Sequence, residues 1–177
     1  MLKKIIVLFL LVTSFCAFSQ EWKQKETTNT SFKIKNFGVN VDGDFSDVTI
    51  QTNFNSEQLS KCFINASIVV KSISTGIESR DKHILEEDYF DEPNHKTIQL
   101  KSSKIEKKSE SNYLLTASLN IKGKSKKIII PLEVIETNSS ISIKANFSIN
   151  RKDFSIGGGS FIMSKTVKIQ VAYFGTK

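Results

Sequence analysis

Three side chains that could carry chemistry stand close together in the sequence: Arg80, Asp81 and His83. A His beside a carboxylate can act as a general acid or base, so one alternative is an enzyme that uses His83 with Asp81 or Arg80. However, adjacent residues point in diverging directions, and no Ser or Cys lies in a recognisable nucleophile motif. We therefore predict no catalytic residues here, and expect Arg80 and Asp81 to close a loop through charge-assisted hydrogen bonds.

The spacing of His and acidic residues does not predict a metal site. His83 and His95 are twelve positions apart, without the closely spaced ligand pair of zinc sites. The glycine run 157–159 is not followed by Lys-Ser or Lys-Thr, as a phosphate-binding loop requires, and is typical of a β connection. We expect neither a metal nor a cofactor.

The first residues have the pattern of a secretory signal peptide, predicted to span 1–19. Two lysines precede the apolar run 5–12, and small residues precede a cleavage site after about Ser19. The run is shorter than the roughly 20 residues of a spanning helix, so we expect no stable membrane anchor after cleavage. Cys16 raises a lipoprotein alternative, which the bulky Phe15 before it disfavours. The predicted location is periplasmic or secreted.

The mature chain is expected to form one domain. Residues 20–30 are polar and without periodicity, which indicates an extended lead-in, and 31–177 form the domain. Only Cys62 remains after cleavage, so no intramolecular disulfide is available. The formal net charge of the full chain is +7 and its pI is about 9.3. Because the basic residues are dispersed and the protein is predicted to be exported, we expect no nucleic-acid partner.

Apolar residues alternate with polar ones along most of the mature chain. From Ile141 to Ile149 every second residue is apolar, which places one apolar row on one face of a strand. Two segments look helical, a short turn at 56–61 and a helix over 82–90. The pattern predicts an all-β antiparallel sandwich or barrel of about eight strands. The candidate strands are 32–34, 37–45, 48–54, 63–74, 97–102, 113–121, 128–134, 141–149 and 167–173.

The inward-facing aromatic residues allow two interpretations. In a sandwich they would fill the core, as in a structural or stress-related interaction protein. In a barrel they could instead line a cavity for one apolar ligand. Periodicity alone does not separate the two.

Several spaced motifs resemble those of the YceI-like family of exported bacterial proteins. The resemblance covers nearly the whole mature chain, although Ala117, Leu100 and Ser155 depart from the usual residues. The matching elements are "VDGDF" at 41–45, "SISTGIESRDKHI" at 72–84, Asp88 with Phe90, "ASLNIKG" at 117–123, and Asn150, Arg151, Asp153 and Phe154.

The resemblance implies an extended, eight-stranded antiparallel lipocalin-like barrel with a short capping helix. It implies a binding protein whose cavity would hold an apolar lipid, either an isoprenoid quinone or a polyprenyl lipid, as ligand. The alternative is an enzyme that acts on such lipids through His83 with Asp81 or Arg80. The sequence leaves open whether the protein forms a homodimer. The capping loop, with Arg80, Asp81, His83 and Phe90, would close one end or meet a head group. By strand parity, the candidate cavity residues are Phe32, Ile34, Phe45, Leu119, Ile121, Phe147, Ile149 and Phe161.

Overall fold

The computed structural model describes residues 21–177; the predicted signal peptide lies outside the described residues. No helix in this range is long and apolar enough to cross a membrane. Short 3-10 turns, η1 (Leu59–Lys61), η2 (Val70–Ser72) and η3 (Arg151–Phe154), and one helix, α1 (Glu78–Ile84), interrupt the strands. The strands are β1 (Lys23–Gln24), β2 (Asn29–Asn36), β3 (Val39–Phe45), β4 (Val48–Thr52), β5 (Ile64–Val69), β6 (Ile73–Ser74), β7 (Thr97–Lys107), β8 (Asn112–Ile121), β9 (Lys124–Glu136), β10 (Ser140–Asn150) and β11 (Met163–Thr176).

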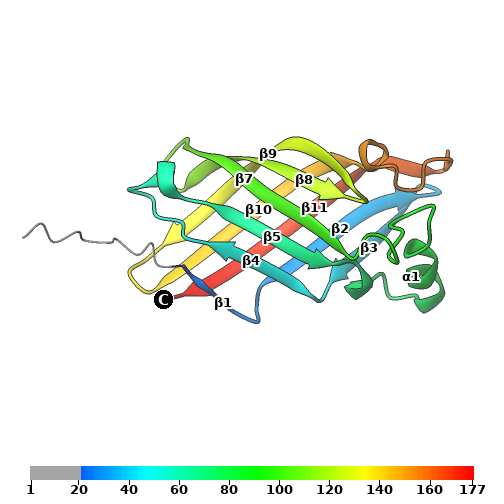
Figure 1. The fold of residues 1–177 in the computed structure, drawn as a ribbon, viewed down its shortest axis with the longest axis horizontal. Coiled ribbons are helices and arrows are strands. Elements are labelled where there is room, and N and C mark those ends of the chain that lie inside the picture. The colour runs from blue at the N-terminus through cyan, green and yellow to red at the C-terminus, as the bar shows by residue number, and fades with distance from the viewer. Residues whose placement is uncertain (1–20) are drawn as a thin grey trace, which may run out of the picture.

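The strands form one curled antiparallel sheet. Their order is β4-β5-β7-β8-β9-β10-β11-β2-β3-β6, with β1 beside β11. The sheet wraps into an elongated barrel with the C-terminus at one end and α1 at the other (Figure 1). This confirms the predicted all-β lipocalin-like fold. The described part of the chain has eleven strands instead of eight, because two-residue β1 and β6 count separately and a two-residue break divides β3 from β4.

The N-terminal segment, which the sequence analysis treats as a lead-in, bridges the β4 edge of the sheet. The backbone N–H of Trp22 donates to Thr52 O at 2.9 Å. The Gln24 side chain donates to Val48 O at 2.7 Å and accepts from Ile50 N at 2.6 Å. These bonds satisfy edge groups of β4 that would otherwise be open to pairing with another chain.

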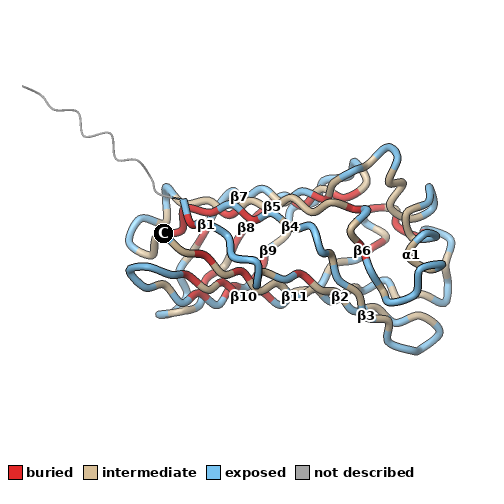
Figure 2. The backbone as a smooth tube through the Cα atoms, turned by 90° about the horizontal axis from the view of Figure 1, so that it is seen from below, coloured by how far each residue is buried: buried red, intermediate tan, exposed pale blue. Residues whose placement is uncertain are grey.

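Burial alternates along the long strands, as the period-two pattern predicts. In β10 the buried residues Ile141, Ile143 and Ala145 alternate with less buried neighbours. The same alternation runs along β8 and β9, and Figure 2 shows short buried stretches alternating with less buried ones along the long strands. Successive strand side chains point to opposite faces, so one row of each strand builds the interior.

The capping helix lies earlier in the chain than predicted. The prediction of 82–90 is wrong in its bounds, since α1 spans Glu78–Ile84. Glu78 and Asp81 lie in its first turn, where negative charge complements the helix dipole, whereas the acidic run 86–88 would oppose the dipole at a C-terminus. The following residues form turns instead, and these bring Phe90 to the barrel.

Candidate ligand cavity

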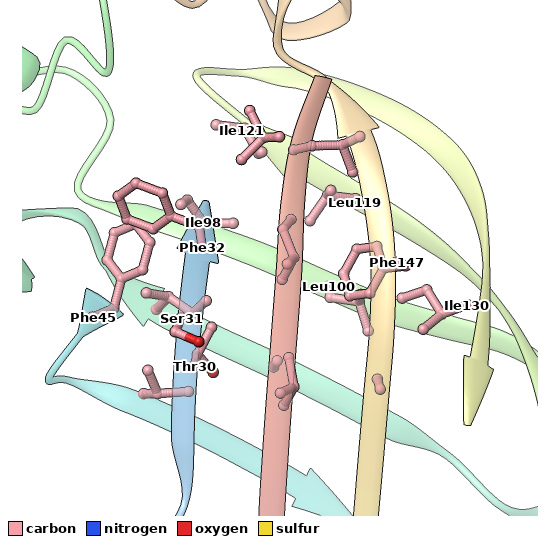
Figure 3. A pocket seen from close by; sticks show the side chains of 18 of the residues that line it. Thr30, Ser31, Phe32, Phe45, Ile98, Leu100, Leu119, Ile121, Ile130 and Phe147 are labelled. Carbon is pink, nitrogen blue, oxygen red and sulfur yellow. The ribbon is translucent and has the colours of Figure 1, made fainter. Parts of the chain in front are cut away.

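A cavity of about 220 Å³ lies inside the barrel. Its wall consists almost wholly of apolar side chains that point inward from the strands (Figure 3). Every second residue of β10 from Ile143 to Ile149 lines it, a length of ~20 Å at about 3.4 Å per residue. The cavity is therefore long, and its shape suits an extended chain.

Seven of the eight side chains predicted to face a cavity line this one. They come from the β2–β3 hairpin, β8 and β10, and Phe90 joins them from the segment after α1. The ring of Phe45 lies 5.8 Å from that of Phe32 and 6.3 Å from that of Phe90. The seven residues are Phe32, Ile34, Phe45, Leu119, Ile121, Phe147 and Ile149.

Phe161 does not line the cavity, and its assignment as a cavity residue is wrong. Its side chain is 99% exposed. The residue lies in the connection between η3 and β11, outside any strand, so the inward and outward alternation of a strand does not apply to it.

Further wall residues were not among those predicted from the sequence. Ile98 and Leu100 lie on β7 and alternate within the predicted strand 97–102, so the same parity argument would have found them. Thr30 also lines the cavity. No signal indicated it, because its segment was interpreted as a lead-in and its side chain is polar.

The hydroxyl of Thr30 is a polar group without a partner inside the apolar wall. Thr30 is 5% exposed, and its Oγ1 has no hydrogen-bond partner among the described residues. It lies beside Phe32 at the cavity wall (Figure 3). A buried hydroxyl without a partner destabilises the empty protein, and it offers a hydrogen bond to a ligand that carries an oxygen at this depth.

Replacing Thr30 with Val is expected to stabilise the ligand-free protein. Val has nearly the same shape and removes the unpaired hydroxyl, so the free energy of unfolding should rise by about 1 kcal/mol. Thermal unfolding of delipidated protein should then shift upward by roughly 2–4 °C. The matched control is Thr52→Val, since Thr52 Oγ1 donates to Phe63 O at 2.7 Å and accepts from Phe54 N at 3.1 Å. The Thr52→Val protein should be less stable than the parent. An equal loss of stability in Thr30→Val would contradict the conclusion that the Thr30 hydroxyl has no partner.

Arg80 and Asp81 both hold Thr75. Asp81 Oδ1 accepts from the Thr75 backbone N–H at 2.9 Å and from the Thr75 hydroxyl. Arg80 Nε donates to Thr75 Oγ1 at 2.7 Å and its Nη2 donates to Thr75 O at 2.7 Å. The two side chains thus close the loop before α1 through a shared residue, without contacting each other directly.

His83 lies on the outside of this cap. Its Nδ1 is 2.7 Å from Glu86 Oε2, its ring packs 5.0 Å from that of Tyr89, and it does not line the cavity. Within residues 21–177, no group of three or more His, Cys, Asp and Glu side chains could hold a metal ion. The structure therefore does not bring Arg80, Asp81 and His83 together as an acid-base set.

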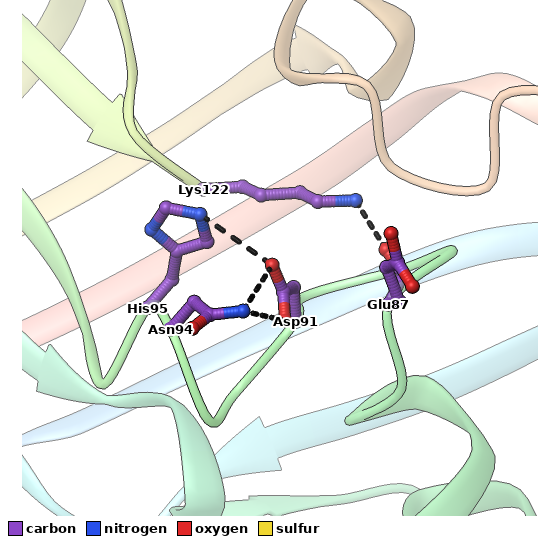
Figure 4. A network of polar contacts seen from close by, with 5 residues as sticks. All are labelled: Glu87, Asp91, Asn94, His95 and Lys122. Carbon is purple, nitrogen blue, oxygen red and sulfur yellow. Dashed lines mark hydrogen bonds and ion pairs between the residues drawn. The ribbon is translucent and has the colours of Figure 1, made fainter.

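A polar network ties the cap to the β8–β9 turn (Figure 4). Asn94 Nδ2 donates to Asp91 Oδ1 at 3.0 Å, and His95 Nε2 lies 3.7 Å from Asp91 Oδ2. Lys122, in the turn, donates to the backbone carbonyl of Glu87. These contacts hold the segment after α1 across the same end of the barrel.

Arg151 holds the connection from η3 to β11 at that end, where the Gly157 N–H donates to Asp88 O at 2.8 Å. In the sequence Arg151 stands out only as part of a family motif. It is 1% exposed and lines the cavity, and its removal from water lowers the pKa of its guanidinium. Its five N–H donors meet five backbone carbonyls of the following connection, those of Ile156 (2.6 Å), Gly157 (2.5 Å), Ser160 (3.1 Å), Met163 (2.9 Å) and Ser164 (2.8 Å).

The whole barrel, with its cavity and cap, matches one known family. The family model described as the YceI-like domain matches residues 22–173. The chain belongs to the YceI-like family. The resemblance drawn from the sequence motifs is thereby confirmed. Among curated YceI-like relatives, a UPF0312 protein of Pectobacterium carotovorum is 25% identical over 191 residues, covering 100% of this chain and 99% of that protein. A UPF0312 protein of Photorhabdus laumondii is 25% identical over 131 residues, covering 70% and 68%.

Solved structures share the YceI-like fold. Burkholderia cenocepacia BcnA superposes with a TM-score of 0.80 at 22% identity, over 84% of this chain and 96% of that one. A polyisoprenoid binding domain from Saccharophagus degradans superposes with a TM-score of 0.70 at 15% identity, over 89% and 98%. At these identities the likeness shows the fold alone.

Proposed function

We propose that this YceI-like protein binds a long isoprenoid lipid, of the quinone or polyprenyl type, inside the barrel. The observation that carries the proposal is the long, almost wholly apolar cavity. Among its lining residues Arg151 is the one charged side chain, and all five of its donors are used by backbone carbonyls. A wall of this kind can bury hydrocarbon and has little with which to recognise a strongly polar molecule.

The energetics favour a chain of several isoprene units. Burying one five-carbon unit contributes about 4 kcal/mol at about 0.8 kcal/mol per carbon. Association costs about 4–15 kcal/mol in lost freedom of motion and ordering of side chains. One unit therefore gives little net affinity, whereas several units along the ~20 Å of wall beside β10 exceed the cost.

The relatives support binding over catalysis. The YceI-like fold, together with a structural neighbour that is a polyisoprenoid binding domain, points to a lipid-binding role. The two alternatives from the sequence fit the structure less well. His83 lies outside the cavity, which gives the lipid-acting enzyme no site, and the open volume of about 220 Å³ argues against a filled-core interaction protein.

We also propose that the protein acts in the periplasm or outside the cell. The support is the sequence pattern of 1–19, with its lysines, its short apolar run and its small residues before Ser19. An isoprenoid is almost insoluble in water, so a water-filled compartment between or outside membranes is a place where an enclosed carrier is useful.

Native mass spectrometry of protein purified from its exporting host tests these proposals. The expected spectrum shows a chain that begins after about Ser19, carrying a stoichiometric adduct whose fragments differ by isoprene units. The same spectrum reads the oligomeric state and so tests the homodimer that the sequence leaves open. A protein without any adduct that also takes up neither quinones nor polyprenyl alcohols would overturn the binding proposal.

A further inference from the structure

Large apolar side chains are exposed together at one end of the barrel. Phe37 is 72% exposed and Val39 67% in the β2–β3 hairpin, and Phe161 and Ile162 are exposed in the connection before β11. The Phe37 N–H donates to Ile162 O at 3.1 Å, so the hairpin and the connection are adjacent. We call these four residues the apolar tip. In Figure 1 its two segments lie at the same end as α1.

The backbone at Phe37 is unusual for such a residue. Phe37 and Gly38 form the two-residue turn with φ values of 51° and 77°. A turn with positive φ at both positions favours Asn, Asp or Gly, because a bulky side chain is strained there. An exposed Phe in this conformation contributes nothing to the core, and such strained residues are found preferentially at functional sites.

Lysines lie beside the Phe161 and Ile162 part of the apolar tip. A shallow surface hollow is lined by Phe161 and Ile162 together with Lys35, Lys152 and Lys165. Within residues 21–177, none of these three lysines forms an ion pair. The one acidic neighbour in sequence is Asp153, which accepts from Asn150 Nδ2 at 3.3 Å.

We propose that the apolar tip docks on the surface of an anionic lipid bilayer. Exposed aromatic and aliphatic side chains insert at the boundary of head groups and acyl chains, and flanking lysines bind lipid phosphates. The positive rim favours this partner over a second copy of the chain, because a symmetric dimer through the tip would bring like charges face to face. The docking itself does not require a ligand in the barrel.

Docking at the tip would bring one end of the cavity to the membrane. Met163 lines both the cavity and the surface hollow beside Phe161. A lipid that leaves the bilayer there has a short path to the cavity. This role of the apolar tip in lipid transfer rests on the proposed function. The connection held by Arg151 lies between the two spaces.

Vesicle co-sedimentation of the full chain as exported tests the docking. The probes are vesicles of phosphatidylcholine alone and of an equal mixture of phosphatidylcholine and phosphatidylglycerol. We expect at least about tenfold tighter binding to the anionic vesicles. The double variant Phe37→Ser/Phe161→Ser should lose at least about tenfold in this affinity, and Lys35→Gln/Lys165→Gln should lose the preference for anionic lipid. The matched control is Ile135→Ser, an exposed residue at the far end of β9, which should bind as the parent protein does.

Two results would overturn the docking proposal. One is vesicle binding that the double Phe variant leaves unchanged. The other is a dimer, seen by size exclusion without vesicles, that the double Phe variant abolishes, since the tip would then be an interface between copies. Lipid binding in the barrel is measured separately from docking. The double Phe variant should still take up a polyprenyl alcohol from detergent, and a variant with a blocked cavity should still bind vesicles.

Discussion

Replacing Ala145 with Trp is expected to reduce isoprenoid uptake by roughly 100-fold or more. Ala145 lines the cavity from β10, where it pairs with Leu132 and Val171. An indole at this position occupies space that the chain needs. Displacing even one five-carbon unit removes about 4 kcal/mol of burial, and each 1.4 kcal/mol is about tenfold in affinity. The measurement is equilibrium uptake of an isoprenoid quinone and of a polyprenyl alcohol from detergent micelles.

The adjacent residue provides a matched control for this variant. Lys144 is exposed and points out of the barrel, so Lys144→Trp adds the same ring without entering the cavity and should keep full uptake. Thermal unfolding checks that Ala145→Trp is folded, because overpacking costs about 1–3 kcal/mol. Ala66→Trp, on the β5 wall, blocks the cavity independently. Undiminished uptake by either folded cavity variant would place the ligand outside the barrel.

Replacing Arg151 with Met is expected to lower the stability of the protein strongly. The substitution keeps an extended apolar side chain but leaves five carbonyl oxygens of the 156–164 connection without their donor. Buried groups that lose a charged partner are costly, and we expect the free energy of unfolding to fall by about 3 kcal/mol. The melting temperature should drop by roughly 6–12 °C, measured by circular dichroism.

Two further variants separate the hydrogen bonds of Arg151 from its charge. Arg151→Lys keeps the charge but has three donors in place of a planar fork of five, so its stability should lie between those of the parent and the Met variant. Lys144→Met removes a charge from the exposed face of β10 and should change stability by less than about 0.5 kcal/mol. A melting temperature of Arg151→Met close to that of the parent would show that the carbonyls find other partners.

The fold was largely predictable from the sequence. Alternation is a local property, and it assigned Leu119, Ile121, Phe147 and Ile149 to the inner face because successive strand residues must point to opposite sides. It failed at Phe161, which lies in a connection, and at Thr30, which is polar and at the start of a strand. The helix was predicted too late in the chain, because residues that favour helices continue beyond those whose charges suit a helix end.

The cavity could not be predicted from alternation. Whether inward side chains meet or leave a space depends on the curvature of the sheet and the distance between opposite walls. These are set by contacts between distant parts of the chain, such as the Tyr173 hydroxyl, which donates to Trp22 O at 3.2 Å across 151 positions. The family motifs implied a cavity, and the three-dimensional packing determines its volume and its wall.

The sequence by itself therefore determined the β architecture, most of the inner face and the residues that close the cap. Only the tertiary structure decided that the interior stays open and that all five donors of Arg151 bind carbonyls of one connection. It also decided that the segments carrying Phe37 and Phe161 are adjacent on the surface. The physical reason is that side-chain direction along a strand follows from local backbone geometry. Open space, shared hydrogen bonds and surface patches arise from segments that the fold brings together.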